Sequence, residues 1–127
     1  MAKVLFDKLA KKNKLNWSAD SCGIATFGGS PATENAIEAV KEEGCDLSGH
    51  ISKPISNELL QEADLVACIS KAHMNAVKGY FPEYEDKIIV LGNGISDPYG
   101  FSLDTYIETM KEIKQEIENL FETELLK

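Results

Sequence analysis

The sequence predicts an α/β fold of three layers, in which helices cover both faces of a small parallel sheet. Two short runs, 63–69 and 87–91, are almost continuously apolar, as strands of parallel sheets are when both of their faces are covered. Segments with the apolar spacing of amphipathic helices precede, separate and follow these runs. This alternation of helices and strands is typical of parallel sheets joined by right-handed crossovers.

The chain opens with a predicted helix, which a predicted strand follows. Leu5, Leu9 and Ala10 share one face of the helix, and lysines fill much of the remaining surface. The strand should run over residues 17–25, where small and apolar residues surround Cys22. A doubly wound α/β domain normally opens with a strand. The opening helix therefore suggests that one strand of the sheet is missing.

A glycine-rich turn at 27–30 should lead into the second helix. Ser30 is a suitable N-cap, because Pro31 follows it at the first helical position. Gly44 is expected to close this helix. Ser56 should cap a short third helix.

The second half of the chain continues the alternation. A helix over 71–78, ended by Gly79, should separate the two buried strands. A long amphipathic helix, from 103 to about 126, should lay its apolar stripe on the sheet. We expect residues 1–127 to form one domain.

Composition excludes several classes of function. The net charge of −8 argues against nucleic acid, whose phosphates need a basic surface. The sequence contains no apolar run of the length of a membrane span and no apolar signal core, so we expect a cytoplasmic protein. Cys22, Cys45 and Cys68 form no Cys-x-x-Cys or Cys/His pattern. They are expected to be buried, reduced thiols, with no metal or cofactor.

Five segments, in this order and spacing, carry a family resemblance. They are 1–10, 20–23 (Asp-Ser-Cys-Gly), 44–50 (Gly-Cys-Asp-Leu-Ser-Gly-His), 63–73 and 97–100 (Asp-Pro-Tyr-Gly). Together they resemble the low-molecular-weight protein tyrosine phosphatases over the whole chain. The resemblance implies hydrolysis of phosphotyrosine, in a protein or as a small aryl phosphate, through a cysteinyl-phosphate.

The resemblance also implies roles for four residues. Asp97 would be the general acid that protonates the leaving tyrosyl oxygen, and Tyr99 would line the pocket. His50 and Ser21 would support the phosphate-binding loop. Plainer interpretations stay open, because an Asp before Pro98 is also typical of a turn. His50 is equally consistent with a loop histidine, and Tyr99 with a packed surface aromatic.

The family's phosphate-binding loop has the form Cys-x5-Arg-Ser, and this chain lacks it. All thirteen basic residues are lysine, which offers a point charge instead of the planar fork of arginine. The segment from Cys22 to Pro31 mimics the loop superficially, but Gly29 stands in the place of the arginine. We therefore expect a chain truncated before Met1, with an internal methionine taken as the start, that is inactive as it stands.

Two other functions stay open. A degenerate member of the family could act as a non-catalytic binding or scaffold module. An arsenate reductase on the same fold fits less well, because such enzymes relay a disulfide and Cys68 has no partner cysteine nearby in the sequence.

The resemblance also makes a structural prediction. In the family the first strand lies inside the sheet, between the strand at Ser21 and the strand at Leu65. Its loss would leave unpaired strand edges. We expect a rearranged three-stranded pairing, a homodimer or strand-swapped assembly, or low stability.

Overall fold

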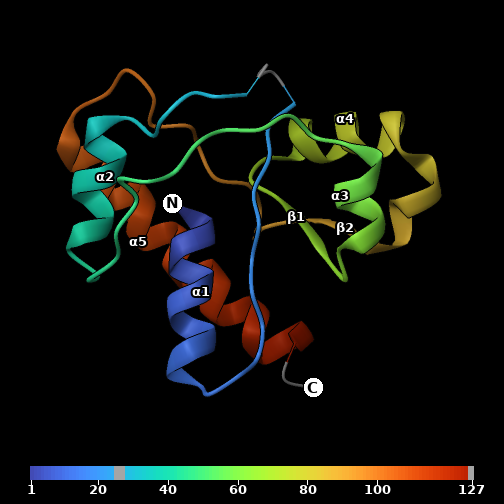
Figure 1. The fold of residues 1–127 in the computed structure, drawn as a ribbon, viewed down its shortest axis with the longest axis horizontal. Coiled ribbons are helices and arrows are strands. Elements are labelled where there is room, and N and C mark those ends of the chain that lie inside the picture. The colour runs from blue at the N-terminus through green and yellow to red at the C-terminus, as the bar shows by residue number, and fades with distance from the viewer. Residues whose placement is uncertain (25–27, 126–127) are drawn as a thin grey trace.

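The computed structural model describes residues 1–24 and 28–125 (Figure 1). The expected α/β architecture is present, with helices on both faces of a small parallel sheet. The elements in chain order are α1 (Ala2–Lys12), α2 (Glu34–Lys41), α3 (Asn57–Glu62), β1 (Val66–Cys68), α4 (Lys71–Tyr80), a 3-10 turn (Pro82–Lys87), β2 (Ile88–Val90), α5 (Leu103–Leu120) and a π turn (Phe121–Leu125).

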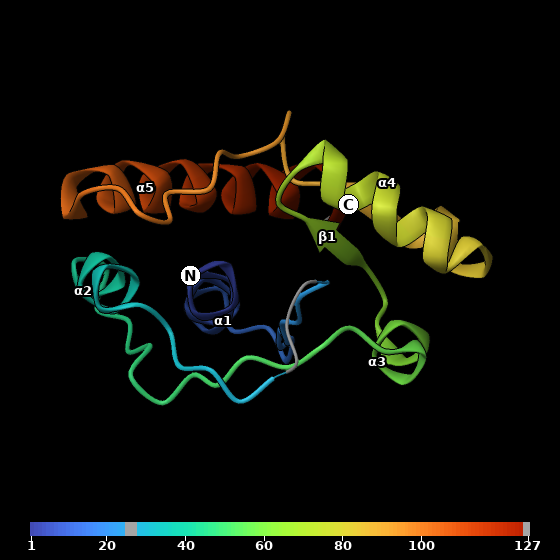
Figure 2. The ribbon, with the colours of Figure 1, turned by 90° about the horizontal axis from the view of Figure 1, so that it is seen from above.

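The two faces of the sheet pack against different helices. α5 lies across α1 and α2, and their buried side chains form the larger apolar cluster, which Leu65, Ile69 and Ile89 join from the strand side (Figure 2). A smaller cluster on the other face holds Cys68 and Ile88 together with side chains from α3 and α4. Side chains alternate along residues 65–69, so Leu65 and Ile69 pack against the larger cluster, whereas Val66 and Cys68 belong to the smaller one.

The observed sheet is smaller than the sequence predicts. β1 and β2 form a parallel pair of three residues each, with Val66 opposite Ile88 and Cys68 opposite Val90. The prediction of a strand over 17–25 is wrong for its described part. Residues 16–24 run in an extended path with one bridge, between Gly23 and Pro54. Ladder hydrogen bonds need a neighbouring strand, which no local sequence pattern supplies.

No rearranged three-stranded sheet forms among the described residues, since the sheet has two strands. The expected three-stranded pairing is therefore wrong for the described residues. The other two expected outcomes, a homodimer or strand-swapped assembly and low stability, stay predictions.

The second helix begins later than predicted. Thr33 and not Ser30 caps it, because the Thr33 hydroxyl oxygen accepts a hydrogen bond from the Ala36 amide at 3.3 Å. Ser30 is engaged elsewhere. Its carbonyl oxygen accepts from the Ser52 amide at 2.7 Å, and its own amide donates to the Ser52 hydroxyl at 3.0 Å. This pairing holds the chain extended and delays the start of the helix.

One helix end differs from prediction. α4 continues through Gly79 to Tyr80 and stops before Phe81, where the following Pro82 disfavours helical backbone. The predicted helix from 103 to about 126 is confirmed as far as the structure describes it, since the π turn Phe121–Leu125 directly continues α5. The cap by Ser56 is confirmed, since the Leu59 amide donates to its hydroxyl oxygen at 3.2 Å.

The C-terminal turn is anchored by aromatic side chains. Phe121 is 2% exposed, and its ring centroid lies 5.0 Å from that of Phe6 and 5.5 Å from that of Trp17. Tilted aromatic pairs at such distances are favourable beyond the area they bury. Trp17 is thus tied to the molecule by its side chain although its backbone joins no sheet.

Glu43 links three parts of the fold by charge. Its carboxylate Oε1 lies 2.7 Å from Lys114 Nζ on α5 and 3.9 Å from Lys8 Nζ on α1. The hydrogen bond from Lys114 is the largest cause that holds the pKa of the Glu43 carboxyl below its ordinary value of 4.5. The Glu43 side chain is 19% exposed and that of Lys114 is 44% exposed, so solvent screens the pair in part.

We expect Glu43→Gln to lower the free energy of unfolding at pH 7 by about 0.5–1 kcal/mol. Because folding lowers this pKa, the stabilisation is present above the unfolded value and disappears as the pH falls from 4.5 through the folded value. Urea titrations at pH 7 and pH 3 should therefore show a deficit only at pH 7. Glu38→Gln is the control, since Glu38 and Lys41 are both more than half exposed. An equal deficit at both pH values would contradict the charge argument.

Candidate functional site

The N-terminal end of α1 lies near α2, with α5 across it (Figures 1 and 2). Met1 is the N-cap of this helix and makes no side-chain cap bond, and the first turn holds no acidic residue. The free amides of the first turn and the helix dipole therefore make this end positive. Such an end is suited to an anion.

His50 lies in this positive environment. It is half-buried, and burial is the first cause that lowers the pKa of its imidazole. The positive charges of the Met1 amino group and Lys3 lower the pKa further, against the opposing charge of Asp20. His50 therefore favours the neutral form, in which one ring nitrogen donates and the other accepts a hydrogen bond.

Asp20 and Lys53 form an ion pair that the sequence did not predict. Lys53 Nζ is hydrogen-bonded to Asp20 Oδ2, and this bond is the first cause that lowers the pKa of the Asp20 carboxyl. The other carboxylate oxygen, Oδ1, accepts from the Ser21 amide at 2.9 Å. The pair joins segments 33 residues apart. Ser21 is half-buried and is thus placed through its backbone.

Asp97 and Tyr99 lie on the loop between β2 and α5. The Tyr99 amide donates to Asp97 Oδ1 at 3.0 Å, which is the side-chain turn that an aspartate before Pro98 favours. Asp97 is exposed. No hydrogen bond in the described part of the chain joins Asp97 to His50 or Ser21.

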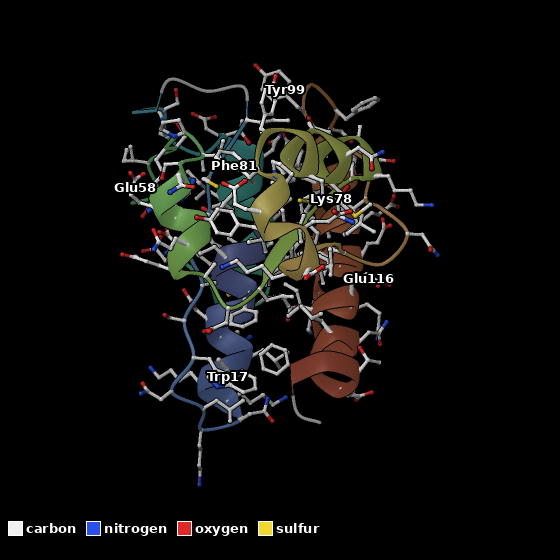
Figure 3. The ribbon with its side chains drawn as sticks, turned by 90° about the vertical axis from the view of Figure 1, so that its right-hand side faces the viewer. Trp17, Glu58, Lys78, Phe81, Tyr99 and Glu116 are labelled. Carbon is white, nitrogen blue, oxygen red and sulfur yellow. The ribbon has the colours of Figure 1, made fainter. Side chains whose placement is uncertain are left out.

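Tyr99 projects into solvent. It is 72% exposed and stands at one end of the molecule, away from Trp17 at the other (Figure 3). The interpretation as a packed surface aromatic is therefore wrong for this structure, and the role as a pocket wall stays a prediction. Phe101, 63% exposed, adds a second aromatic to the same loop.

Asn35 fixes this loop against α2. Its side-chain amide donates to the carbonyl oxygen of Phe101 at 3.3 Å, across 66 residues of sequence. The Phe101 amide in turn donates to the Pro98 carbonyl oxygen at 2.9 Å. Sequence reasoning missed this positioning role of Asn35, since no local pattern reports a contact at such separation.

The three cysteines lack the environment of a nucleophile. Burial is the first cause that raises the pKa of Cys22, Cys45 and Cys68. Cys45 and Cys68 are buried, as expected, whereas Cys22 is exposed as a residue and its thiol is only partly desolvated. A reactive thiol needs a lowered pKa, so that it is a thiolate at neutral pH. Part of the loop that follows Cys22 lies outside the described residues.

No group of three or more His, Cys, Asp or Glu side chains within residues 1–24 and 28–125 has the arrangement of a metal site. Within the same residues, no helix is long and apolar enough to span a membrane.

Comparison with known proteins points to one family. Residues 1–127 match the family model described as low molecular weight phosphotyrosine protein phosphatase. The protein-arginine-phosphatase of Bacillus subtilis (strain 168) is 32% identical to this chain over 94% of it and 84% of the relative. An arsenate reductase of Staphylococcus aureus is 34% identical, over 82% of this chain and 74% of the relative.

Solved structures agree with the sequence relatives. The low molecular weight protein tyrosine phosphatase of T. tengcongensis superimposes with a TM-score of 0.90 at 34% identity, over 95% of this chain and 87% of that one. Vibrio vulnificus Wzb in complex with benzylphosphonate superimposes with a TM-score of 0.87 at 27% identity, over 95% of this chain and 86% of that one. These comparisons do not support the expectation that this chain is truncated. The match over residues 1–127 and the agreement of the folds establish that the chain belongs to the low molecular weight phosphotyrosine protein phosphatase family.

Proposed function

We propose that this fold serves the hydrolysis of phosphomonoesters with Asp97 as the general acid, and that the 127-residue polypeptide is inactive when it is alone. The observation that carries the first part is the exposed Asp97, held by the Tyr99 amide on a loop that Asn35 ties to α2. A carboxylate that is accessible and positioned in this way can exchange protons with a substrate. The complex of a relative with benzylphosphonate supports a phosphate-like ligand.

The proposed reaction has two steps. A thiolate attacks phosphorus, the bond from phosphorus to the tyrosyl oxygen breaks, and the leaving oxygen takes the proton of Asp97. Water then attacks the cysteinyl-phosphate and gives a proton to the Asp97 carboxylate, which releases inorganic phosphate and restores the thiolate. Tyr99 would lie against the aromatic ring of the substrate.

The second part of the proposal rests on the groups that hold the phosphate. The sequence contains no arginine, and a lysine cannot grip two phosphate oxygens with a planar fork. The raised pKa values of the three thiols leave little thiolate at pH 7. The positive end of α1 remains, but it supplies neither the nucleophile nor the clamp.

Phosphoarginine is a second candidate substrate, because the relative that aligns over 94% of this chain is a protein-arginine-phosphatase. Asp97 would then protonate a guanidinium nitrogen instead of a phenol oxygen. If the 127-residue polypeptide has no phosphatase activity, its alternative function is that of a non-catalytic binding module. Arsenate reduction is less well supported, since Cys68 is buried and its thiol pKa is raised.

The test is a phosphatase assay on the purified polypeptide. We expect no release of phosphate above buffer from p-nitrophenyl phosphate or from a phosphoarginine peptide, because the nucleophile and the arginine clamp are each worth orders of magnitude in rate. Iodoacetamide treatment is the matched control and should change nothing. Turnover that iodoacetamide abolishes, and that one of the variants C22S, C45S or C68S also abolishes, would overturn the proposal of inactivity.

A further inference from the structure

A hollow of about 300 Å³ lies between β2 and the second half of α5. Residues 89–92 form one wall, and Glu116, Asn119, Leu120 and Thr123 form the other. This volume is at the lower limit of sites that bind small molecules. None of the four residues assigned to the phosphatase site lines the hollow, so it is a separate place on the molecule.

The two walls of the hollow differ in chemistry. The β2 wall is apolar, and Ile89 and Val90 are only half-buried, so part of this apolar surface stays open. The α5 wall carries oxygen atoms of Glu116, Asn119 and Thr123. These residues are three and four positions apart, which places them on one side of the helical backbone. A ligand that matches both walls is apolar at one end and donates hydrogen bonds at the other.

The negative charge of this wall is not compensated within the described part of the chain. Glu116 is half-buried on α5 (Figure 3), and its carboxylate has no ion pair or hydrogen bond there. A β-carbon on Gly92 would collide with this carboxylate, so the glycine lets it lie against the backbone. The residues three and four positions away on α5 are Glu112, Ile113, Asn119 and Leu120, and none of them is a cation. A partly buried carboxylate without a partner favours a cation from outside.

Another hollow, of about 90 Å³ between α1 and α5, shows the opposite arrangement. Its carboxylate, Glu43, lies 2.7 Å from Lys114 Nζ and 3.9 Å from Lys8 Nζ. The protein itself therefore compensates the charge of Glu43, whereas that of Glu116 is left for a ligand.

The acceptors beside Glu116 suit an ammonium group. The Thr123 hydroxyl donates its proton to the Asn119 carbonyl oxygen at 2.9 Å, so its own oxygen can still accept. Asn119 Oδ1 accepts from Gln115 Nε2 at 3.2 Å and has a second lone pair. An ammonium group has three donors that rotate toward acceptors on successive turns, whereas the fork of a guanidinium group is planar.

We propose that the hollow between β2 and α5 binds a small primary amine that carries one ring or a short alkyl chain. The ammonium group pairs with Glu116 and donates to Asn119 and Thr123, and the apolar part lies against Ile89 and Val90. This binding site goes beyond the proposed phosphatase chemistry and does not depend on it.

The probe is 2-phenylethylamine, which is charged at pH 7 as lysine is. Chemical shifts of backbone amides and methyl groups, measured by NMR during a titration, should change at residues 89–92 and 116–123. We expect a dissociation constant of about 1 mM, as for a ligand with so few atoms. 2-Phenylethanol, which has the ring without the charge, should bind at least about fivefold more weakly, and so should ethylamine, which has the charge without the ring.

Two variants test the role of the carboxylate. Glu116→Gln keeps the shape of the side chain and removes its charge, so it should weaken binding of 2-phenylethylamine about fivefold to tenfold and leave 2-phenylethanol unchanged. Glu112→Gln is the matched control, because it removes an equal charge one turn away, at an exposed position outside the hollow. It should change the affinity by less than about twofold. If Glu116→Gln does not fold, the comparison of amine and alcohol on the unaltered protein still decides the proposal.

Three results would overturn the proposal. The first is equal affinity for 2-phenylethylamine and 2-phenylethanol, which would show that the charge is not recognised. The second is equal weakening by Glu116→Gln and Glu112→Gln, because the amine would then respond to the general negative charge of α5. The third is a set of shift changes that leaves out residues 89–92 and 116–123. Weakening confined to Glu116→Gln, with shift changes around the hollow, would support the site.

Discussion

When a strand and a Cys-x5-Arg-Ser loop taken from a relative are joined to this polypeptide, we expect the engineered protein to hydrolyse phenyl phosphate. In that protein Asp97→Asn will lower kcat about 10²- to 10³-fold. Phenol is a poor leaving group, so its oxygen needs a proton as the bond to phosphorus breaks. Asparagine keeps the size of the side chain and its capacity to accept from the Tyr99 amide, but it has no acidic proton.

The measurement compares two leaving groups in steady-state kinetics. p-Nitrophenol leaves readily as an anion, so Asp97→Asn should lower kcat for p-nitrophenyl phosphate by about tenfold or less. Asp104→Asn is the matched control, because Asp104 is an exposed aspartate in the first turn of α5 and should leave both rates unchanged. An equal loss on both substrates would show that Asp97 acts through the turn and not as a proton donor.

Local chemistry made part of this site predictable. Asp97 before Pro98 forms the turn that its sequence favours, because the partner of the side chain is two residues away. The cap of α3 by Ser56 follows the same rule, since both groups of the hydrogen bond lie within one helical turn. Features whose partners are close in sequence are visible in the sequence.

Other parts of the site depend on segments that meet only in the folded chain. The pair of Asp20 with Lys53 and the bond from Asn35 to Phe101 span 33 and 66 residues. Residues 16–24 are a further case in which the local sequence does not reveal whether a distant partner is present. Its composition suits a strand, but a strand needs a neighbour, and the described sheet gives it none.

The buried faces of the helices could be predicted, because apolar residues recur along a helix with a period of 3.6 residues. α5 shows this most clearly, with Tyr106, Met110, Ile113 and Ile117 buried on one face as the sequence predicts. After Leu120 the helical backbone continues as a π turn over Phe121–Leu125, where Phe121 packs against Phe6 and Trp17. The pattern predicts the buried face and the length of this helix, but not the change from α to π hydrogen bonding in its last turn.

Met110→Ala will have the largest effect on stability among single truncations in α5, at about 2–5 kcal/mol. Met110 is 0% exposed, in the middle of the helix that packs across both α1 and α2. The truncation removes the apolar contacts of the side chain and leaves a cavity between three helices that cannot close without moving α5. Urea unfolding followed by circular dichroism measures the loss.

The expected loss is large because the sheet contributes little. Its two strands of three residues form a short ladder, so the contacts of α5 with α1 and α2 carry much of the core. A protein of this size is stable by about 5–15 kcal/mol, and a free edge on β1 favours the lower end. Glu112→Ala, on the exposed face of α5, should cost less than about 0.5 kcal/mol. A loss below about 1 kcal/mol for Met110→Ala would mean that the helices are packed too loosely around it for a cavity to form.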